Sequence, residues 1–441
     1  MSTTESASTA RMPLPEGTIP VAIGLFIAGV CSFAFFRVGK AALGGEEEFK
    51  PIVSMWFATF ALAPGFFLPL EQELGRAISS RRTLGNGGRP VLVKVAALGL
   101  ALVLIVSITL FAAGPILAEH YFGGSWVMVV ALVLSIAAYA PTHLSRGICS
   151  GSGRFRAYAV VLGADGLVRI LLCVILAAIG VKAVGWYGLA VAVAPLVGVL
   201  AVASKRQLRT DPGPPATWTE VTPNLGWLLL GSVMAAALVN AGPIATNILA
   251  GKSEASSVTL FGYGVILARV PLFLFQAVQA ALLPRLARLA AANEMEEFRS
   301  GFKKLLYIVI GVGALGTAGA FVLGPFAVDL IFDGTLGRRT LAVLALGSAF
   351  YMLGLAIAQA VIALHGHAQV ALGWTVGMAV FVATTAAVRG EVFRRVELGL
   401  LMGSAAAMVV FALALRSRLA AGAVPDEASM LQAFTDMPLE G

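Results

Sequence analysis

Long apolar runs separated by short polar breaks cover almost the whole of this 441-residue sequence. A helix needs about 20 apolar residues to cross the hydrocarbon core of a bilayer, and twelve of the runs are about that long. No alternating pattern typical of β-strands accompanies them, so each run is expected to be a helix that satisfies its own backbone hydrogen bonds. The expected spans are 18–38, 51–71, 91–114, 126–146, 157–179, 184–204, 225–249, 257–283, 303–325, 340–364, 369–388 and 397–415.

The composition places the chain among membrane proteins. Hydrophobic residues make up 59% of it and charged residues only 12%, whereas an average soluble domain has about 25% charged residues. This balance excludes an ordinary soluble protein and predicts an all-α, multi-pass protein of the cytoplasmic membrane. The net charge of +8 is expected to come from basic loops beside anionic membrane lipids, and not from nucleic-acid binding.

The sequence predicts no cofactor and no metal site. Cys31, Cys149 and Cys173 lie in or beside apolar runs and are expected to be small buried side chains. The four histidines are scattered and show no ligand spacing. No nucleotide-binding loop of the pattern Gly-x-x-x-x-Gly-Lys-Ser/Thr is present, so the chain is expected to have no nucleotide-driven motor of its own.

The distribution of lysine and arginine predicts the orientation, because basic loops stay in the cytoplasm. With the N-terminus inside, the inner segments hold 19 of these residues and the outer segments hold 10. Both termini are therefore expected in the cytoplasm. The first apolar run lacks a clean small-residue cleavage site, so it is expected to be a retained span and not a signal peptide.

A proline-rich polar segment divides the spans six and six. It contains Asp211-Pro-Gly-Pro-Pro215. The expected organisation is a disordered cytoplasmic N-terminus (1–17), a six-helix bundle (18–204), a cytoplasmic linker (205–223), a second six-helix bundle (224–416) and a disordered cytoplasmic tail (417–441). A short interfacial helix is expected at 293–304. Pro64, Phe66 and Gln72 recur as Pro271, Phe273 and Gln279 at one common offset, as two related halves would give.

Asp165 and Arg169 are the two charges inside the apolar run 158–179. At a spacing of four residues, both side chains lie on one face of a helix, one turn apart. An unpaired charge at mid-depth in a bilayer costs roughly 2.5–3.5 kcal/mol on insertion scales. The spacing therefore predicts an intramembrane ion pair, either structural or functional.

Two stretches resemble a known transporter superfamily. Pro271-Leu-Phe-Leu-Phe-Gln-Ala-Val-Gln-Ala-Ala-Leu-Leu-Pro-Arg-Leu-Ala-Arg288 is similar to the eighth helix of lipid II flippases and polysaccharide exporters. The region 146–169, with its Gly-Ser-Gly-Arg-Phe turn, resembles the fourth and fifth helices of oligosaccharide flippases. The six-plus-six layout fits the same multidrug/oligosaccharidyl-lipid/polysaccharide (MOP) superfamily. The resemblance implies a MOP-type fold of about twelve helices in two bundles.

The sequence departs from lipid II flippases in two respects. They usually have fourteen helices, and this chain has no room for the last two. They also carry a functional arginine five residues before the proline of the eighth helix, where this chain has Ile266. Arg269 lies two residues before Pro271, so its role has to be argued separately.

In the superfamily, helices 1, 2, 7 and 8 line a central cavity. The resemblance therefore implies substrate contacts from Arg269, Arg37, Gln72, Asn240, Gln276 and Gln279. The interiors of spans 1, 7 and 8 carry no carboxylate, which a cation-coupled drug exporter would be expected to hold. An arginine suits a phosphate, because its planar fork donates hydrogen bonds in pairs and stays charged.

Glu71 and Glu73 lie at the cytoplasmic end of the second expected span. One interpretation is a solvated helix end in which Glu73 pairs with Arg76. The other is a cytoplasmic gate that latches to a basic residue of the other half.

The favoured hypothesis is a flippase that moves a polyprenyl-diphosphate-linked oligosaccharide by alternating access, without enzymatic activity. Its expected partners are the lipid-linked glycan substrate, anionic membrane lipids and glycan-assembly proteins of the same membrane, with the monomer as the functional unit. One alternative is a cation-coupled multidrug antiporter of the same superfamily. Another is a membrane glycosyltransferase that uses polyprenyl-linked sugars, since Glu46-Glu-Glu48 is expected on the first external loop.

Overall fold

The computed structural model describes residues 18–221, 225–251, 255–272, 275, 294–364 and 366–420. The part of the chain within these ranges is helical and contains no β-strand. Its first half consists of α1 (Thr18–Leu43), α2 (Glu46–Thr83), α3 (Arg89–Ala112), α4 (Gly114–Ile116), the π-helical turn η1 (Leu117–Tyr121), α5 (Trp126–Gly151), α6 (Phe155–Ala178) and α7 (Val184–Ser204). Its second half consists of α8 (Trp218–Val221), α9 (Leu225–Leu249), α10 (Ala255–Ala268), α12 (Met295–Phe332), α13 (Arg338–Ala363), α14 (His367–Ala387) and α15 (Val392–Ala420).

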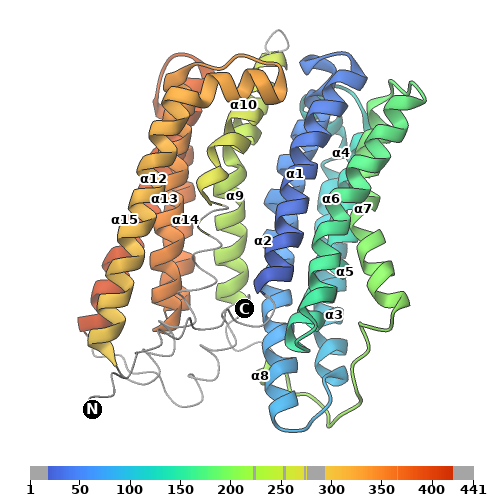
Figure 1. Ribbon diagram of the computed structural model, residues 1–441, viewed down its shortest axis with the longest axis vertical. Coiled ribbons are helices and arrows are strands. Elements are labelled where there is room, and N and C mark those ends of the chain that lie inside the picture. Colours follow the sequence, from blue (N-terminus) through green and yellow to red (C-terminus); the bar gives the residue numbers. More distant parts are fainter. Residues whose placement is uncertain are drawn as a thin grey trace, which may run out of the picture.

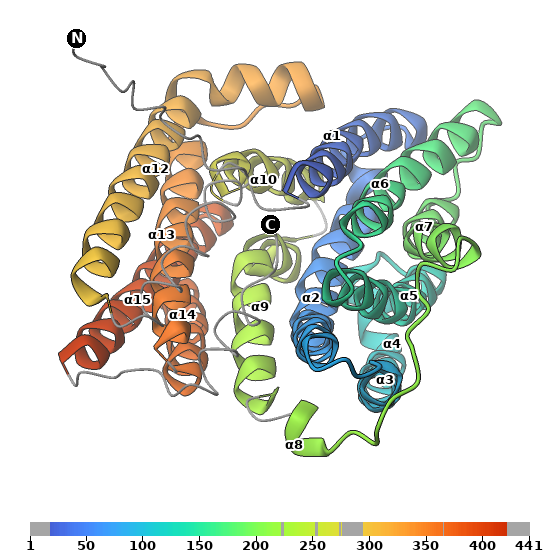
Figure 2. The same ribbon diagram turned by 60° about the horizontal axis from the view of Figure 1, so that its bottom comes forward.

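The predicted fold class is confirmed. Among the described residues, eleven helices are long and apolar enough to cross a membrane, and the shorter apolar helix 256–272 coincides with the remaining expected span. Figures 1 and 2 show two bundles side by side, with α1–α7 in one and α9–α15 in the other. Helices α9 and α10 of the second bundle face α2 of the first.

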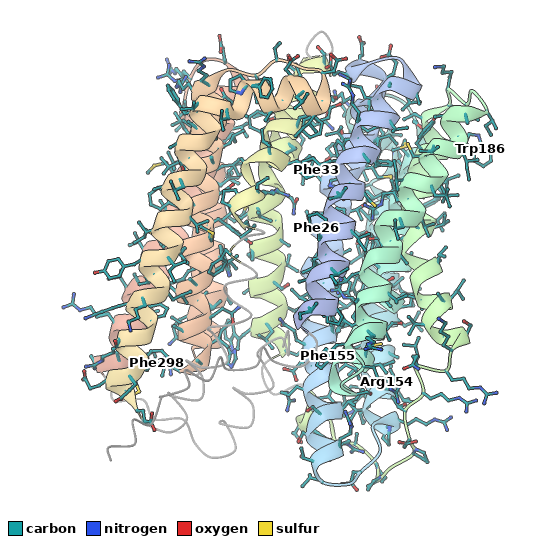
Figure 3. All side chains as sticks on the ribbon, viewed as in Figure 1. Phe26, Phe33, Arg154, Phe155, Trp186 and Phe298 are labelled. Atoms are coloured by element: carbon teal, nitrogen blue, oxygen red, sulfur yellow. The ribbon has the colours of Figure 1, made fainter. Side chains whose placement is uncertain are left out.

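Large apolar side chains cover the outer faces of the bundles, as contact with lipid tails requires. Phe26 and Trp186, labelled in Figure 3, are 72% and 58% exposed. The most peripheral helices are α3 and α12, whose most apolar windows are largely unburied. The inner faces instead carry small and aromatic residues that pack helix against helix.

Three expected boundaries differ from the structure. Helix α2 begins at Glu46, so the acidic run 46–48 forms its first turn and is not a loop. The same helix continues to Thr83, which places Glu71 and Glu73 well inside it. Residues 295–304 are the first turns of α12, and not a separate interfacial helix. In each case a polar segment extends an apolar helix beyond the bilayer, which hydropathy alone does not reveal.

At the end of the molecule that lies at the top of Figure 1, side chains of α1, α10 and α12 meet between the bundles. The rings of Tyr263 and Phe332 stack with their centroids 4.4 Å apart, and Phe36 packs edge-on against Tyr263 at 6.0 Å. Lys40 of α1 donates hydrogen bonds to the Phe332 and Asp333 carbonyl oxygens at 2.5 and 2.8 Å. We call these five residues the seal. It lies at the end that the charge distribution predicts to be external.

The linker between the bundles is attached to the first bundle. Arg81 of α2 donates to the Glu220 carboxylate at 2.5 Å and to the Pro214 carbonyl at 2.8 Å. Arg154, just before α6, donates to the Arg209 carbonyl at 3.0 Å. The ammonium of Lys94 lies 4.1 Å from the centre of the Trp218 ring. Side chains of the first bundle thus hold the linker at several points.

Candidate functional site

A cavity of about 580 Å³ lies between the two bundles. Helices α1, α2, α5, α6, α9, α13 and α14 contribute to its wall, as do Arg269 and Leu272, which follow α10. It extends from mid-depth toward the end where α5 ends and α14 begins, opposite the seal. Its polar and charged lining consists of Ser32, Gln72, Tyr139, His143, Arg146, Asp165, Arg169, Ser232, Asn240, Arg269, Tyr351, Gln359 and His367. Its aromatic lining consists of Trp56, Phe60, Trp227 and Trp374.

Two prolines create hydrogen-bond acceptors beside this cavity. A proline has no N–H, so the carbonyl four residues before it in a helix loses its usual donor. Pro64 in α2 releases the Phe60 carbonyl in this way, and Asn240 of α9 donates to that oxygen at 2.9 Å. Pro243 in α9 releases the Val239 carbonyl, which accepts a hydrogen bond from Arg269.

Arg269 lies at a break in its helix. Helix α10 ends at Ala268, and Pro271 follows. Besides Val239, the guanidinium donates to the Asn240 side-chain oxygen at 3.1 Å and lies 5.4 Å from the centre of the Phe57 ring. Carbonyls and a ring orient the arginine, but they do not cancel its charge.

Within the part of the chain that the structure describes, the charge of Arg269 has no carboxylate counterpart. Among the described residues, none within ion-pair distance of Arg269 is acidic. A charge at this depth is stable when it faces water, a distant partner or an anionic ligand.

Arg169 lies in a neutralised cluster on the opposite wall. It forms an ion pair with Asp165, one turn earlier in α6, and only 2% of Arg169 is exposed. The Tyr139 hydroxyl donates to the other Asp165 oxygen at 2.9 Å. The guanidinium lies 4.6 Å from the centre of the Trp56 ring. Arg169 therefore adds aromatic and hydrogen-bonding character to the cavity, with little net charge.

A second neutralised cluster surrounds Glu71. One of its carboxylate oxygens accepts from His143 at 2.7 Å and from Arg146, both on α5. The other oxygen accepts from the Tyr158 hydroxyl of α6 at 2.8 Å. Glu71 is buried, and all these partners belong to the first bundle. Glu73 is also buried and pairs with Arg76 at 2.7 Å.

The structure confirms that Glu73 pairs with Arg76, but not that this part of the helix is solvated. Neither carboxylate lies at a solvated helix end, since both are buried inside α2. In this conformation, the partners of both carboxylates among the described residues come from α2, α5 and α6, and none is a basic residue of the second bundle.

The other expected substrate contacts divide into three groups. Arg269, Gln72 and Asn240 line the cavity. Arg37 does not: it lies at the seal, 3.5 Å from the Asp333 carboxylate. Because Arg37 lies near the end of the first span, its side chain is at the seal and does not line the cavity. Gln276 and Gln279 lie outside the described residues.

The sequence reasoning missed Tyr139, His143, Arg146 and Tyr158. One available signal was the i,i+3 and i,i+4 spacing of Tyr139, His143 and Arg146, which places them on one face of α5. That their partners would be Glu71 and Asp165 depends on how α2, α5 and α6 pack. The spacing within one helix does not contain this information.

No protein-family model matches the chain. Among curated proteins, uncharacterized proteins of Mycobacterium tuberculosis and Mycobacterium bovis are 25% identical over 367 residues, which is 79% of this chain and 80% of theirs.

Solved structures of MOP superfamily transporters share the fold. A MATE in the straight conformation has a TM-score of 0.68 at 17% identity, covering 92% of this chain and 95% of that one. An outward-facing multidrug resistance MATE family transporter of the MOP superfamily has a TM-score of 0.65 at 16% identity, with the same coverage. A MOP superfamily transporter from Pyrococcus furiosus, described by the reverse polarity of its binding pocket, has a TM-score of 0.64 at 16% identity, covering 92% and 95%. The chain therefore has the fold of MOP superfamily transporters.

Proposed function

We propose that this protein is a membrane transporter that works by alternating access. Two observations support the proposal: the fold of MOP transporters and a cavity between the bundles that lies opposite a sealed end. Opening the seal while the other end closes would expose the same cavity to the opposite side of the membrane.

We further propose that its cargo is an anionic amphiphile, specifically a polyprenyl-diphosphate-linked oligosaccharide of the cytoplasmic membrane. The observation that carries this proposal is the charge balance of the cavity wall. Its charged lining residues are Arg146, Arg169, Arg269 and Asp165. Glu71 neutralises Arg146 and Asp165 neutralises Arg169, so Arg269 supplies the surplus charge. A diphosphate would provide the missing negative charge.

The rest of the wall suits such a cargo. Trp56, Phe60, Trp227 and Trp374 offer flat apolar faces of the kind that pack against sugar rings and isoprenoid units. Gln72 and Gln359 offer side-chain amides, which both donate to and accept from hydroxyl groups.

The second candidate is a cation-coupled drug exporter. It is favoured by Asp165, a carboxylate that lines the cavity, and by the multidrug resistance transporter among the structural neighbours. Against it, Asp165 already has Arg169 and Tyr139 as partners. A bound drug cation would have to compete with both. The two candidates predict opposite signs of cargo charge.

The deciding experiment measures translocation of a fluorescent polyprenyl-diphosphate glycolipid and of a cationic dye in proteoliposomes. Wild type, Arg269→Lys and Arg269→Ala are compared, with Arg338→Ala as the control because Arg338 is exposed outside the cavity. We expect strong loss of glycolipid transport in Arg269→Ala, partial loss in Arg269→Lys and no loss in the control. Normal glycolipid transport by Arg269→Ala, or transport of the dye alone, would overturn the diphosphate cargo.

A further inference from the structure

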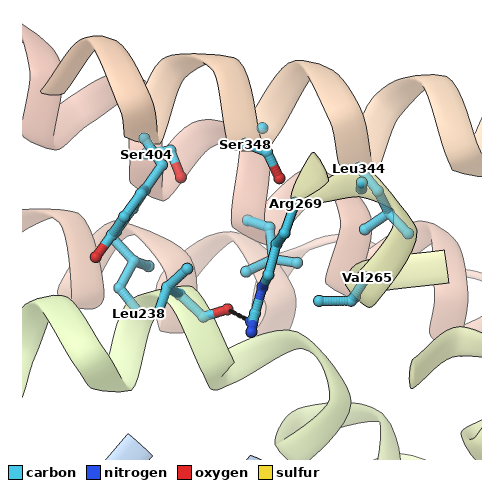
Figure 4. Close-up of a pocket in the computed structure, with 11 residues that line it drawn as sticks. Leu238, Val265, Arg269, Leu344, Ser348 and Ser404 are labelled. Carbon is cyan, nitrogen blue, oxygen red and sulfur yellow. Dashed lines mark hydrogen bonds between the residues drawn. The ribbon is translucent and has the colours of Figure 1, made fainter. Parts of the chain in front are cut away.

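A second, much smaller pocket lies on the side of Arg269 that faces the interior of the second bundle. Its volume is about 30 Å³, and α9, α10, α13 and α15 form its wall. Figure 4 shows Arg269 between Ser348 and Leu238 in this pocket. The wall consists of Leu238, Val239, Val265, Ala268, Arg269, Leu344, Gly347, Ser348, Tyr351, Leu400 and Ser404. A cavity must offer roughly 10–15 Å³ to hold one water molecule, so this one has room for a single small ion or one to two waters.

The two serines of the pocket do not donate to their own helices, as several other hydroxyls of the protein do. Thr246, Thr317 and Thr375 each donate to the carbonyl four residues earlier in their own helix, at 2.9, 2.8 and 2.8 Å. Neither Ser348 nor Ser404 makes such a bond, although both lie inside helices of the described region. Ser404 is only 4% exposed. Both hydroxyls line the pocket and can therefore donate to a group inside it.

The lining of the pocket carries a positive charge. Arg269 contributes a positive charge that no described carboxylate balances. The one tyrosine hydroxyl in the wall, that of Tyr351, donates to the Ala235 carbonyl at 3.2 Å. The polar groups left over are thus one guanidinium and two hydroxyls, all of which can donate hydrogen bonds. Hydrogen-bond donors that line a small space beside a surplus cation favour an anion over a cation there.

We propose that this pocket binds a small monovalent anion, of the size and charge of chloride. Arg269 supplies the charge, and the Ser348 and Ser404 hydroxyls supply neutral donors. The anion balances the buried arginine when no cargo occupies the main cavity. The site stands on contacts inside the second bundle, so it does not depend on what the main cavity carries.

The test uses purified full-length protein in nanodiscs without any glycolipid. Thermal unfolding is followed in sodium chloride, sodium bromide and sodium gluconate at equal ionic strength, because a ligand that binds only the folded state raises Tm with its concentration. We expect a saturable increase in Tm with chloride and bromide, and none with gluconate, which is too large for the pocket. The halide concentration at half-saturation should rise about tenfold in Ser404→Ala and more in Ser348→Ala/Ser404→Ala. Arg269→Lys should weaken the effect, and Arg269→Ala should abolish it.

Thr375→Ala is the matched control, since its hydroxyl is engaged within α14 and does not line the pocket. It should keep the full halide effect. If Arg269→Ala does not fold, the serine variants and Arg269→Lys still decide the matter. Equal Tm in all three salts, or an unchanged halide effect in the serine variants, would overturn the anion site and indicate that water fills the pocket. Neither result bears on glycolipid transport, so this proposal and the proposed cargo can fail separately.

Discussion

The Lys40 ammonium lies 2.5 Å from the carbonyl oxygen of Phe332, and this contact joins the end of α1 to the end of α12. Asp333, in the left-handed conformation (φ 54°), ends α12. The carbonyls of a final helical turn have no partners within the helix and carry partial negative charge. Lys40 satisfies two of them across the interface between the bundles, and only 8% of Lys40 is exposed.

Replacing this ammonium should favour opening of the sealed end. Lys40→Met keeps most of the side-chain volume but removes the ion pair with Glu46 and the two hydrogen bonds across the interface, each of the latter worth about 1.5–3 kcal/mol. We expect the open population at this end to rise at least tenfold. Spin labels at Ala41 and Thr335, both exposed, report the separation by pulsed electron resonance. Lys303→Met, at an exposed lysine of the opposite end, should leave the distance distribution unchanged. An unchanged distribution in Lys40→Met would mean that the aromatic contacts alone hold the seal.

The orientation can be measured with an impermeant thiol reagent. The three native cysteines are buried, so background labelling should be small. Gly213 is a poor position for a probe, because an added Cβ would lie 2.8 Å from the Gly87 nitrogen. Asp211 and Thr335 are exposed at opposite ends of the molecule. With both termini inside, Thr335→Cys should react in intact cells and Asp211→Cys only after permeabilisation. The reverse pattern would invert the topology.

Removing the partner of Arg169 should destabilise the first bundle. Asp165→Asn leaves a buried guanidinium that faces Trp56 without a counter-charge, and breaking a buried pair costs roughly 3 kcal/mol or more. We expect less folded protein and a lower Tm in detergent. Exchange of the two residues should restore only part of the loss, because Tyr139 and Trp56 are placed for the native arrangement. Wild-type abundance and Tm in Asp165→Asn would mean that the pair contributes little.

The Glu71 cluster should behave as one structural unit. Tyr158→Phe removes the hydrogen bond to the Glu71 carboxylate and should cost about 1.5–3 kcal/mol. Glu71→Gln removes the charge that pairs with Arg146 and accepts from His143, and it should cost more, about 3–5 kcal/mol. Glu48→Gln is the control, at an exposed glutamate of the same helix. The measurement is Tm of the purified variants. Equal losses for Tyr158→Phe and Glu71→Gln would argue against a shared charge.

The spans and the Asp165–Arg169 contact follow from patterns within single helices. Apolar length defines a span, and a spacing of four residues places two side chains on one face. Both patterns are local, so they can be read without knowing how the helices pack. Among the described residues, eleven of the twelve expected spans are helices of sufficient length, a shorter apolar helix overlaps the remaining one, and the expected contact is present.

Contacts between helices could not be read in the same way. Arg37 and Arg269 look alike in the sequence, yet one lies at the seal and the other lines the cavity. Glu71 looks solvated because polar residues follow it, but α2 continues and packs against α5. Prolines offered the best unused signal. Pro64 and Pro243 each leave the carbonyl four residues earlier without its helical donor. Asn240 donates to the first of these carbonyls and Arg269 to the second, and both side chains line the cavity.

The attachment of the linker to the first bundle determines where the chain can be divided into two co-expressed pieces. A break before Lys205 would separate Arg81 and Arg154 from the carbonyl and carboxylate groups that they bind. A break between Val221 and Leu225 would keep every one of these contacts within the first piece. Because these hydrogen bonds join the linker to the first bundle, the linker belongs structurally to the N-terminal piece.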